Sequence, residues 1–272
     1  MGELTGTLSS GLTGTLSPKS PPKFSKSKFG TYDDMINLMC LFSVKLQVPV
    51  YYRLLPGNIK DVSAFKICLI ESGVKDAIVI IDKGFASMSN IEALEKEELK
   101  FIIPLPRNSS LIDYQKAASG NKRLFEGYFQ FEGRYIWHYA NTVDEEKTET
   151  ETETKTKMVT VFLDEELRNR EEKDYLNRIE SKTVNYTLEK FHAKRHTFGT
   201  IAMIDNTDKP SRDTYVNYKM RGQVETMIDS LKNIVDADRT YMQNQVTLEG
   251  WMFVNLIALK WYYNHPEPAQ KT

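Results

Sequence analysis

Residues 77–81 form an unbroken apolar run, Ala-Ile-Val-Ile-Ile, that ends at Asp82. A strand without polar alternation is expected where both faces of a sheet are covered, as in the centre of an α/β fold. Gly84 follows closely and allows the backbone to turn sharply. A carboxylate at the carboxyl end of such a strand lies where open α/β sheets bind their ligands. The run therefore predicts an α/β fold with Asp82 as a candidate site residue; a plain loop start is the alternative.

The segments around this run continue the alternation of strands and helices. Residues 35–43 and 47–55 are two β-prone runs that predict an antiparallel hairpin. A helix is expected over 62–72, and a second helix over 89–98 opens with a Ser-x-x-Glu capping box. Residues 100–106 then predict a strand that prolines end.

From about residue 108 to residue 197 the pattern becomes richer in strands and aromatic residues. Residues 125–130 and 134–140 predict a hairpin. Trp137 belongs to an aromatic row at period two, for which stacking on an extruded base and ordinary packing are the two interpretations. Residues 144–157 alternate Thr and Glu and predict a loop. A returning strand, a charged helix and a strand that rejoins the sheet are expected at 159–163, 164–180 and 198–204.

The stretch from Tyr218 to Lys232 has helical periodicity. At about 100° per residue, five polar side chains fall within roughly 60° of one another, namely Tyr218, Arg221, Glu225, Asp229 and Lys232. Apolar residues occupy a separate arc, so we expect one continuous amphipathic helix with the polar stripe at the edge of its buried face. A solvated face is the alternative to a site.

These residues carry a resemblance to a known family. The pattern Tyr-x2-Arg-x3-Glu-x6-Lys is similar to the signature of insertion-sequence transposases with an RNase H-like catalytic domain, and the string Leu-Leu-Pro-Gly-Asn-Ile-Lys-Asp at 54–61 also resembles this family. The resemblance implies that Asp82 and Glu225 are the second and third carboxylates of a DDE metal site. It further implies DNA contacts from Tyr218, Arg221, Lys232 and Lys83.

The resemblance implies an RNase H-like mixed sheet with flanking helices, interrupted by a β-rich insertion before the glutamate-bearing helix. The implied activity is DNA strand cleavage and strand transfer at insertion-sequence ends, with Mg²⁺ as cofactor and Mn²⁺ as a substitute. The implied partners are double-stranded DNA with terminal inverted repeats and a second copy of the chain.

The family's first catalytic aspartate, expected in an Asp-x-Thr context, has no clear counterpart. No aspartate precedes Asp33, and the nearest match is Glu3-Leu4-Thr5. Three interpretations stay open: the aspartate lies on sequence missing from an amino-terminally truncated chain, Glu3 takes its place, or the protein is an inactive remnant that retains DNA or transposase-subunit binding. A nuclease of the RNase H type that uses water alone is a further alternative.

The chain is expected to divide into five segments. These are a flexible basic segment (1–30) read as loop or frayed strand, the first part of the core (31–107), the insertion (108–197), the second part of the core with the signature helix and a last helix (198–264), and a tail (265–272).

The composition limits the classes of function. A formal charge of −1 and a pI near 6.5 over 272 residues argue against a wholly basic nucleic-acid coat, so DNA contacts must come from local patches. Cys40 and Cys68 are far apart in apolar settings and indicate buried structural thiols. The longest apolar run, 251–259, is too short to span a bilayer, and we expect a cytoplasmic, nucleoid-associated protein without a membrane partner.

Overall fold

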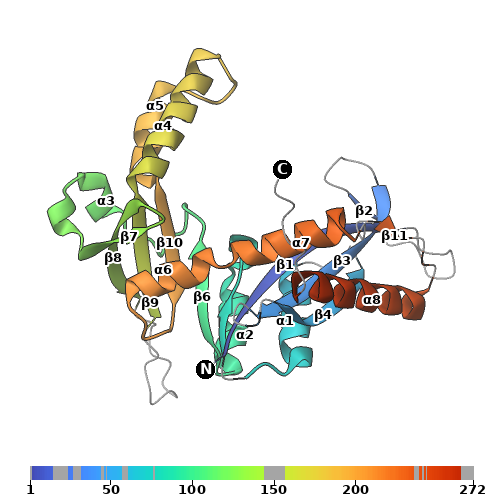
Figure 1. Ribbon diagram of the computed structural model, residues 1–272. Coiled ribbons are helices and arrows are strands. Elements are labelled where there is room, and N and C mark those ends of the chain that lie inside the picture. Colours follow the sequence, from blue (N-terminus) through green and yellow to red (C-terminus); the bar gives the residue numbers. More distant parts are fainter. Residues whose placement is uncertain are drawn as a thin grey trace, which may run out of the picture. The chain divides into compact units, whose positions relative to one another are not determined.

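The computed structural model describes residues 2–14, 24–26, 32–43, 46, 48–56, 61–75, 77–143, 157–235, 239–240, 242 and 244–264. The chain forms two compact units (Figure 1): unit 1 contains Met1–Lys100 and Lys219–Thr272, and unit 2 contains Phe101–Tyr218. The segment boundaries expected from the sequence stay predictions. Residues 144–156 of the expected acidic loop lie outside the described residues.

The sheet of unit 1 is built around β1 (Gly2–Gly14). It pairs antiparallel with β3 (Tyr32–Ser43) and parallel with β5 (Ala77–Ile80), while β4 (Val48–Pro56) pairs antiparallel with β3. Three antiparallel strands followed by a parallel one, in the order β4-β3-β1-β5, are the arrangement expected of an RNase H-like sheet. The predicted α/β fold class and the predicted hairpin are therefore confirmed. Two short strands, β2 (Phe24–Lys26) and β11 (Arg239–Thr240), pair with β3 and β1.

The first thirty residues differ from the prediction of a loop or frayed strand. Strand β1 covers Gly2–Gly14 and forms backbone ladders on both edges, from Leu4↔Ser43 to Thr13↔Met35 with β3 and from Gly2↔Ala77 to Thr5↔Ile80 with β5. Its Ser, Thr and Gly composition lacks the apolar pattern of a central strand. The strand depends on hydrogen bonds to segments distant in the sequence, which local composition does not reveal.

Helices cover both faces of this sheet. One face carries α7 (Gly222–Asn233) and α8 (Gln245–Asn264), which share a buried cluster with Leu38, Cys40 and Phe42 of β3. Met39 and Leu41 have the opposite parity in the strand and are also buried. The remaining helices of unit 1 are α1 (Asp61–Ser72), which contacts β3 and β4, the 3-10 turn η1 (Lys83–Phe85) and α2 (Met88–Lys96).

Both cysteines are buried and free, as predicted. Cys40 lies on β3 and Cys68 on α1. Burial raises the pKa of Cys40 to about 12 and that of Cys68 to about 11, which keeps both thiols protonated and unreactive at neutral pH. Their role is packing.

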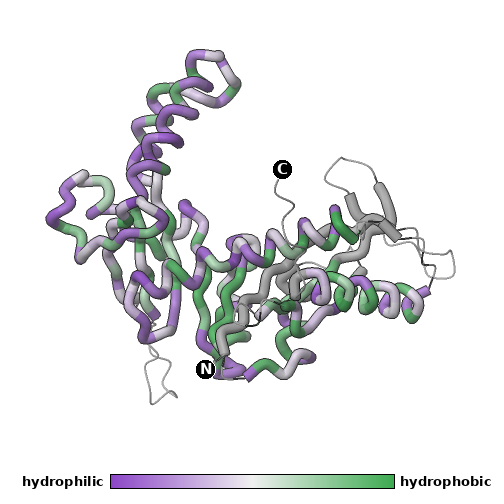
Figure 2. Tube along the Cα trace, viewed as in Figure 1, coloured by the Kyte–Doolittle hydropathy of each residue, from purple (hydrophilic) through white to green (hydrophobic). Residues whose placement is uncertain are grey.

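Helix α8 is buried on one side only, although its apolar sequence predicted nearly all-round burial. Leu248, Met252, Leu256 and Leu259 pack into the core, while Phe253 is 54% exposed. Further exposed apolar side chains on this helix are Val246, Val254, Ile257, Trp261 and Tyr262. Figure 2 shows hydrophobic residues recurring along α8. None of the helices in the described part of the chain combines the length and hydropathy that crossing a bilayer requires.

Unit 2 contains an antiparallel sheet in the order β6-β10-β9-β8-β7. Its strands are β6 (Lys100–Leu105), β7 (Gly127–Phe131), β8 (Arg134–Val143), β9 (Lys157–Asp164) and β10 (Thr200–Asp205). The predicted hairpin is β7–β8, and Glu132 and Gly133 form its turn with positive φ angles of 49° and 78°. The strand expected to rejoin the sheet is β10, which lies between β6 and β9.

The helices of unit 2 include an arm made of α4 (Glu165–Glu180) and α5 (Leu188–Lys194). Tyr175, Phe191 and Phe198 form its buried contact, and Figure 2 shows that α4 is hydrophilic along most of its length. Asp164 caps α4 by accepting a hydrogen bond from the Leu167 amide. The other helical elements are α3 (Gln115–Ser119), η2 (Lys122–Leu124), η3 (Arg195–Thr197) and α6 (Ser211–Lys219).

Candidate functional site

The predicted signature helix is interrupted just before its glutamate. Helix α6 ends at Lys219 and α7 begins at Gly222. In the turn between them, the amides of Gln223 and Val224 donate to the carbonyls of Met220 and Arg221 at 3.0 Å, which is the i to i+3 pattern of a tight turn.

This break separates the five residues of the predicted stripe. Tyr218 lies on α6 in unit 2, whereas Arg221, Glu225, Asp229 and Lys232 belong to unit 1. The prediction of one continuous stripe is therefore wrong for Tyr218. Its DNA contact stays a prediction.

Asp82 follows β5 directly, at the carboxyl end of the strand, as the apolar run predicted. Its side chain accepts a hydrogen bond from the Lys83 amide at 2.7 Å and so caps the turn η1. One carboxylate oxygen, Oδ1, is thereby fixed by the backbone. The other oxygen, Oδ2, is left to face α7.

A residue that the sequence did not single out holds the turn after Asp82. Asn90 on α2 is fully buried, and its side-chain amide donates to the Phe85 carbonyl at 2.9 Å. Phe85 is itself buried and ends η1. The signal for this role in the sequence is slight, because an asparagine in a helix is more often exposed.

Arg221 joins the two predicted carboxylates. Its Nη1 atom lies 2.7 Å from Glu225 Oε1 and 3.3 Å from Asp82 Oδ2. These two contacts bound the distance between the carboxylate oxygens at about 6 Å, although 142 residues separate Asp82 and Glu225 in the sequence. The Arg221 side chain is 18% exposed, and those of Asp82 and Glu225 are 39% and 59% exposed. The site is a partly open, charged edge of unit 1.

The donor set at this edge suits a hard divalent cation. Asp82 and Glu225 offer only carboxylate oxygens, and they already hold one cationic group, the Arg221 guanidinium, between them. Glu225 also lies in the first turn of α7, where the helix dipole favours a negative charge. Among the described residues, however, no group of three His, Cys, Asp or Glu side chains could hold a metal ion together.

Two lysines flank the carboxylates. Lys83 is exposed beside Asp82, and Lys232 is half-buried two turns after Glu225 on α7. Within the described part of the chain, neither lysine forms an ion pair with an acidic side chain. Both ammonium groups are thus available to an external anion.

The register of β1 locates Glu3. The strand pairs Glu3 with Ile78 and Thr5 with Ile80, so Glu3 lies four residues before the level of Asp82. At a rise of about 3.3 Å per residue, this offset is roughly 13 Å along the strand. Continuing the same register places Thr7, rather than Glu3, level with Asp82. The role of Glu3 as a metal ligand stays a prediction.

Trp137, the other weak candidate, lies on β8 in unit 2. Its ring contacts Phe125 and Tyr128, and the Lys122 ammonium lies 4.9 Å from the ring centroid. These contacts within the chain favour packing over base stacking.

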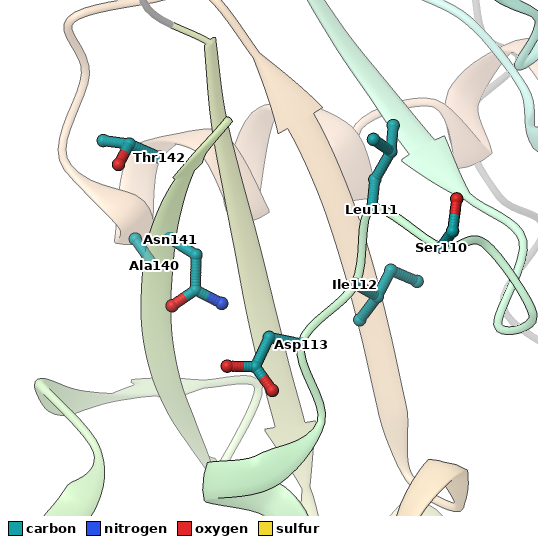
Figure 3. A pocket seen from close by; sticks show the side chains of 7 residues that line it. All are labelled: Ser110, Leu111, Ile112, Asp113, Ala140, Asn141 and Thr142. Atoms are coloured by element: carbon teal, nitrogen blue, oxygen red, sulfur yellow. The ribbon is translucent and has the colours of Figure 1, made fainter. Parts of the chain in front are cut away.

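An open pocket of about 610 Å³ also lies within unit 2. Figure 3 shows the seven side chains that line it, from Ser110, Leu111, Ile112, Asp113, Ala140, Asn141 and Thr142. It includes neither predicted carboxylate and is not part of the candidate site.

The fold and the carboxylate pair define the class of the protein, an RNase H-like domain with an acidic site at the carboxyl end of a central strand. The family model described as "Transposase DDE domain" matches residues 12–261, and the chain belongs to this transposase family. The predicted resemblance is confirmed at this level. Members of the family act on DNA with divalent metal ions.

Comparison with solved structures gives a match to a chain of the piggyBac transposase synaptic complex with hairpin DNA, determined by cryo-electron microscopy. The TM-score is 0.47 and the sequence identity 11%, and the match covers 97% of this chain. It covers 47% of the piggyBac chain, so the present chain spans about half of that protein. Comparison with curated proteins gives no match.

Proposed function

We propose that this transposase domain cleaves DNA strands at the ends of an insertion sequence and transfers the resulting 3′-hydroxyl end to a target, with Asp82 and Glu225 as catalytic carboxylates. The observation that carries the proposal is the convergence of both carboxylates on Arg221, within about 6 Å of each other. Membership of the transposase family supports the choice of DNA as the substrate.

In this proposal the carboxylates are held in place by different means. The Lys83 amide fixes Asp82 Oδ1, and the buried Asn90 keeps the turn behind it in position. Glu225 is presented by the first turn of α7, whose buried residues Val224 and Met227 anchor the helix in the core. Oriented oxygen ligands of this kind are what Mg²⁺ requires.

When bound, Mg²⁺ would activate the attacking hydroxyl group and stabilise the leaving oxygen of the phosphodiester. Mn²⁺ is the expected substitute. The cationic side chains act on the DNA itself: the Arg221 guanidinium has the fork geometry for bidentate contact with a phosphate, and Lys83 and Lys232 add point charges. Tyr218 is proposed to contact the DNA backbone. The active complex is proposed to contain two copies of the chain at paired inverted repeats on chromosomal DNA.

The test is cleavage of duplex DNA that carries the terminal inverted repeat, with and without Mg²⁺ or Mn²⁺. We expect metal-dependent nicking and strand-transfer products that disappear in Glu225→Gln. Asp229→Asn is the matched control, because Asp229 is an exposed acid one turn further along α7. Cleavage that survives in Glu225→Gln would contradict the proposal, and nicking without strand transfer would indicate a nuclease that uses water alone.

A second candidate function is a catalytically inactive remnant that retains DNA or transposase-subunit binding. The observation that favours it is the pair of carboxylates without a third acidic ligand among the described residues. It predicts no cleavage with either metal, together with DNA retention that weakens with salt. Lys232→Ala should then reduce the slope of log affinity against log salt by about one contact. A wild-type protein that neither cleaves nor retains DNA would contradict both candidates.

A further inference from the structure

The Asp82–Arg221–Glu225 triad has nearly all its acceptor atoms in use. Asp82 Oδ1 accepts from the Lys83 amide, whereas Asp82 Oδ2 and Glu225 Oε1 both face Arg221 Nη1. Glu225 Oε2 is the one oxygen of the pair for which the described residues provide no partner. A metal ion held by both carboxylates would therefore compete with Arg221 for at least one oxygen.

We propose that Arg221 is an internal counter-cation that occupies the carboxylate pair in the metal-free protein, and that loading of a divalent ion releases its guanidinium toward the DNA. This inference rests on the proposed function and adds an order of events to it. The same side chain would close the acidic site when empty and contact a phosphate when the site is loaded.

Electrostatics gives the release its direction. Two carboxylates within about 6 Å repel each other, and the single positive charge of Arg221 offsets this repulsion. A divalent ion brings twice the charge to the same oxygens and repels the guanidinium. Because Arg221 is only 18% exposed, a displaced guanidinium gains either water or an external anion such as a DNA phosphate.

The arrangement also explains why Arg221 lies before the first residue of α7 and not within it. From this position its side chain reaches Glu225 one turn along the helix and Asp82 on the neighbouring turn. A residue one turn further along α7, such as Asp229, forms no ion pair among the described residues. The reach to both carboxylates is particular to position 221.

The direct test follows the side-chain Nε–H resonance of Arg221 in the full-length ¹⁵N-arginine-labelled protein during titration with Mg²⁺. Arg221→Lys assigns the resonance. We expect it to move toward the position of a solvated arginine with the same midpoint as Mg²⁺ binding measured by calorimetry. Arg53, which pairs with Glu71 at 3.4 Å in the same unit, is the internal control and should not move.

Calorimetry provides a second measurement. Arg221→Ala should bind Mn²⁺ roughly two- to tenfold more tightly than the wild type, since one or two weak ion pairs no longer compete. Arg53→Ala should bind Mn²⁺ as the wild type does. Should Arg221→Ala fail to fold, the resonance of the wild-type protein still decides the question.

The outcomes separate this inference from the proposed function. Mg²⁺ binding that requires Asp82 and Glu225 while the Arg221 resonance stays in place would overturn the inference and leave the metal site standing. Mg²⁺ binding that persists in Asp82→Asn and Glu225→Gln would overturn both. Binding to neither the wild type nor Arg221→Ala would likewise overturn the inference, whereas binding to Arg221→Ala alone would support it.

Discussion

The buried side-chain amide of Asn90 donates to the Phe85 carbonyl at 2.9 Å and so ties α2 to the turn that follows Asp82. Asn90→Ala leaves this carbonyl without its donor, and we expect the free energy of unfolding to fall by about 1–3 kcal/mol. The turn that carries Asp82 should loosen, so metal binding should weaken as well. Chemical denaturation and calorimetry measure the two effects; Asn185→Ala, in a loop of unit 2, is the control.

Asp82 is both a carboxylate of the site and the cap of η1, and two substitutions separate these roles. Asp82→Asn keeps a side-chain oxygen for the Lys83 amide, so stability should stay near that of the wild type, while cleavage should fall by more than about 100-fold. Asp82→Ala should lose cleavage and also about 0.5–2 kcal/mol of stability. Equal stability of the two variants would contradict the capping role.

The register of β1 leads to a gain-of-function prediction. Because Thr7 is level with Asp82 in the continued β1–β5 ladder, Thr7→Asp should supply the third acidic ligand and raise Mg²⁺ affinity at least about tenfold. Ser9→Asp lies about 6.6 Å further along the strand and serves as the control. Calorimetry decides between them, and an equal effect of both aspartates would mean that only bulk charge matters.

Gly199 should be required for docking of the α4–α5 arm in unit 2. Its φ angle is +70°, and an added β carbon would lie 2.5 Å from both Arg168 Cβ and the Asp164 carbonyl oxygen. Gly199→Ala should therefore cost at least about 3 kcal/mol, the sum of backbone strain and overpacking. In Gly133→Ala, φ is +78° but no atom lies within 4 Å, so it should show the backbone cost alone. Thermal unfolding of both variants tests the difference.

Stability should decrease in mild acid because of His138. Burial lowers the pKa of this imidazole below its ordinary value of 6.5, and Glu126 offsets the shift only in part. The unfolded chain then binds the proton more readily than the folded protein, so stability is complete above pH 6.5 and falls as the pH drops below it. Denaturation at several pH values should show a smaller loss in His138→Leu than in the wild type, with exposed His192→Asn behaving as the wild type.

Much of the fold was predictable because its periodicity is local. The apolar run of β5, the hairpin β3–β4 and the helix α4 follow patterns within a dozen residues, and the structure confirms them. Strand β1 was missed because its stability comes from pairing with β3 and β5 rather than from its own side chains.

Helix starts and the helix break were less predictable. Helix α2 is capped by Ser87 rather than Ser89, and the amide of Thr247 at the start of α8 bonds to Asn244. Several polar residues near each start could act as the cap, and tertiary packing selects one. The interruption before Gly222 has only a weak signal, since a single glycine is tolerated in many helices.

The candidate site was predictable in its residues but not in its connections. The sequence pointed to Asp82 and Glu225, whereas the ion pairs of Arg221 with both and the support from Asn90 depend on contacts across 142 intervening residues or on burial. Neither can be read from spacing.

Unit 2 enters the chain after Lys100 and leaves it before Lys219, between the two carboxylates in sequence order. Its length can therefore change by insertion or deletion while the bonds that orient Asp82 and Glu225 stay within unit 1. The number of residues between the pair is thus free to drift among homologous sequences. An alignment that penalises long gaps between an Asp-Lys-Gly-Phe string and an Arg-x3-Glu pair would misplace such proteins, whereas one that scores the two strings separately would retain them.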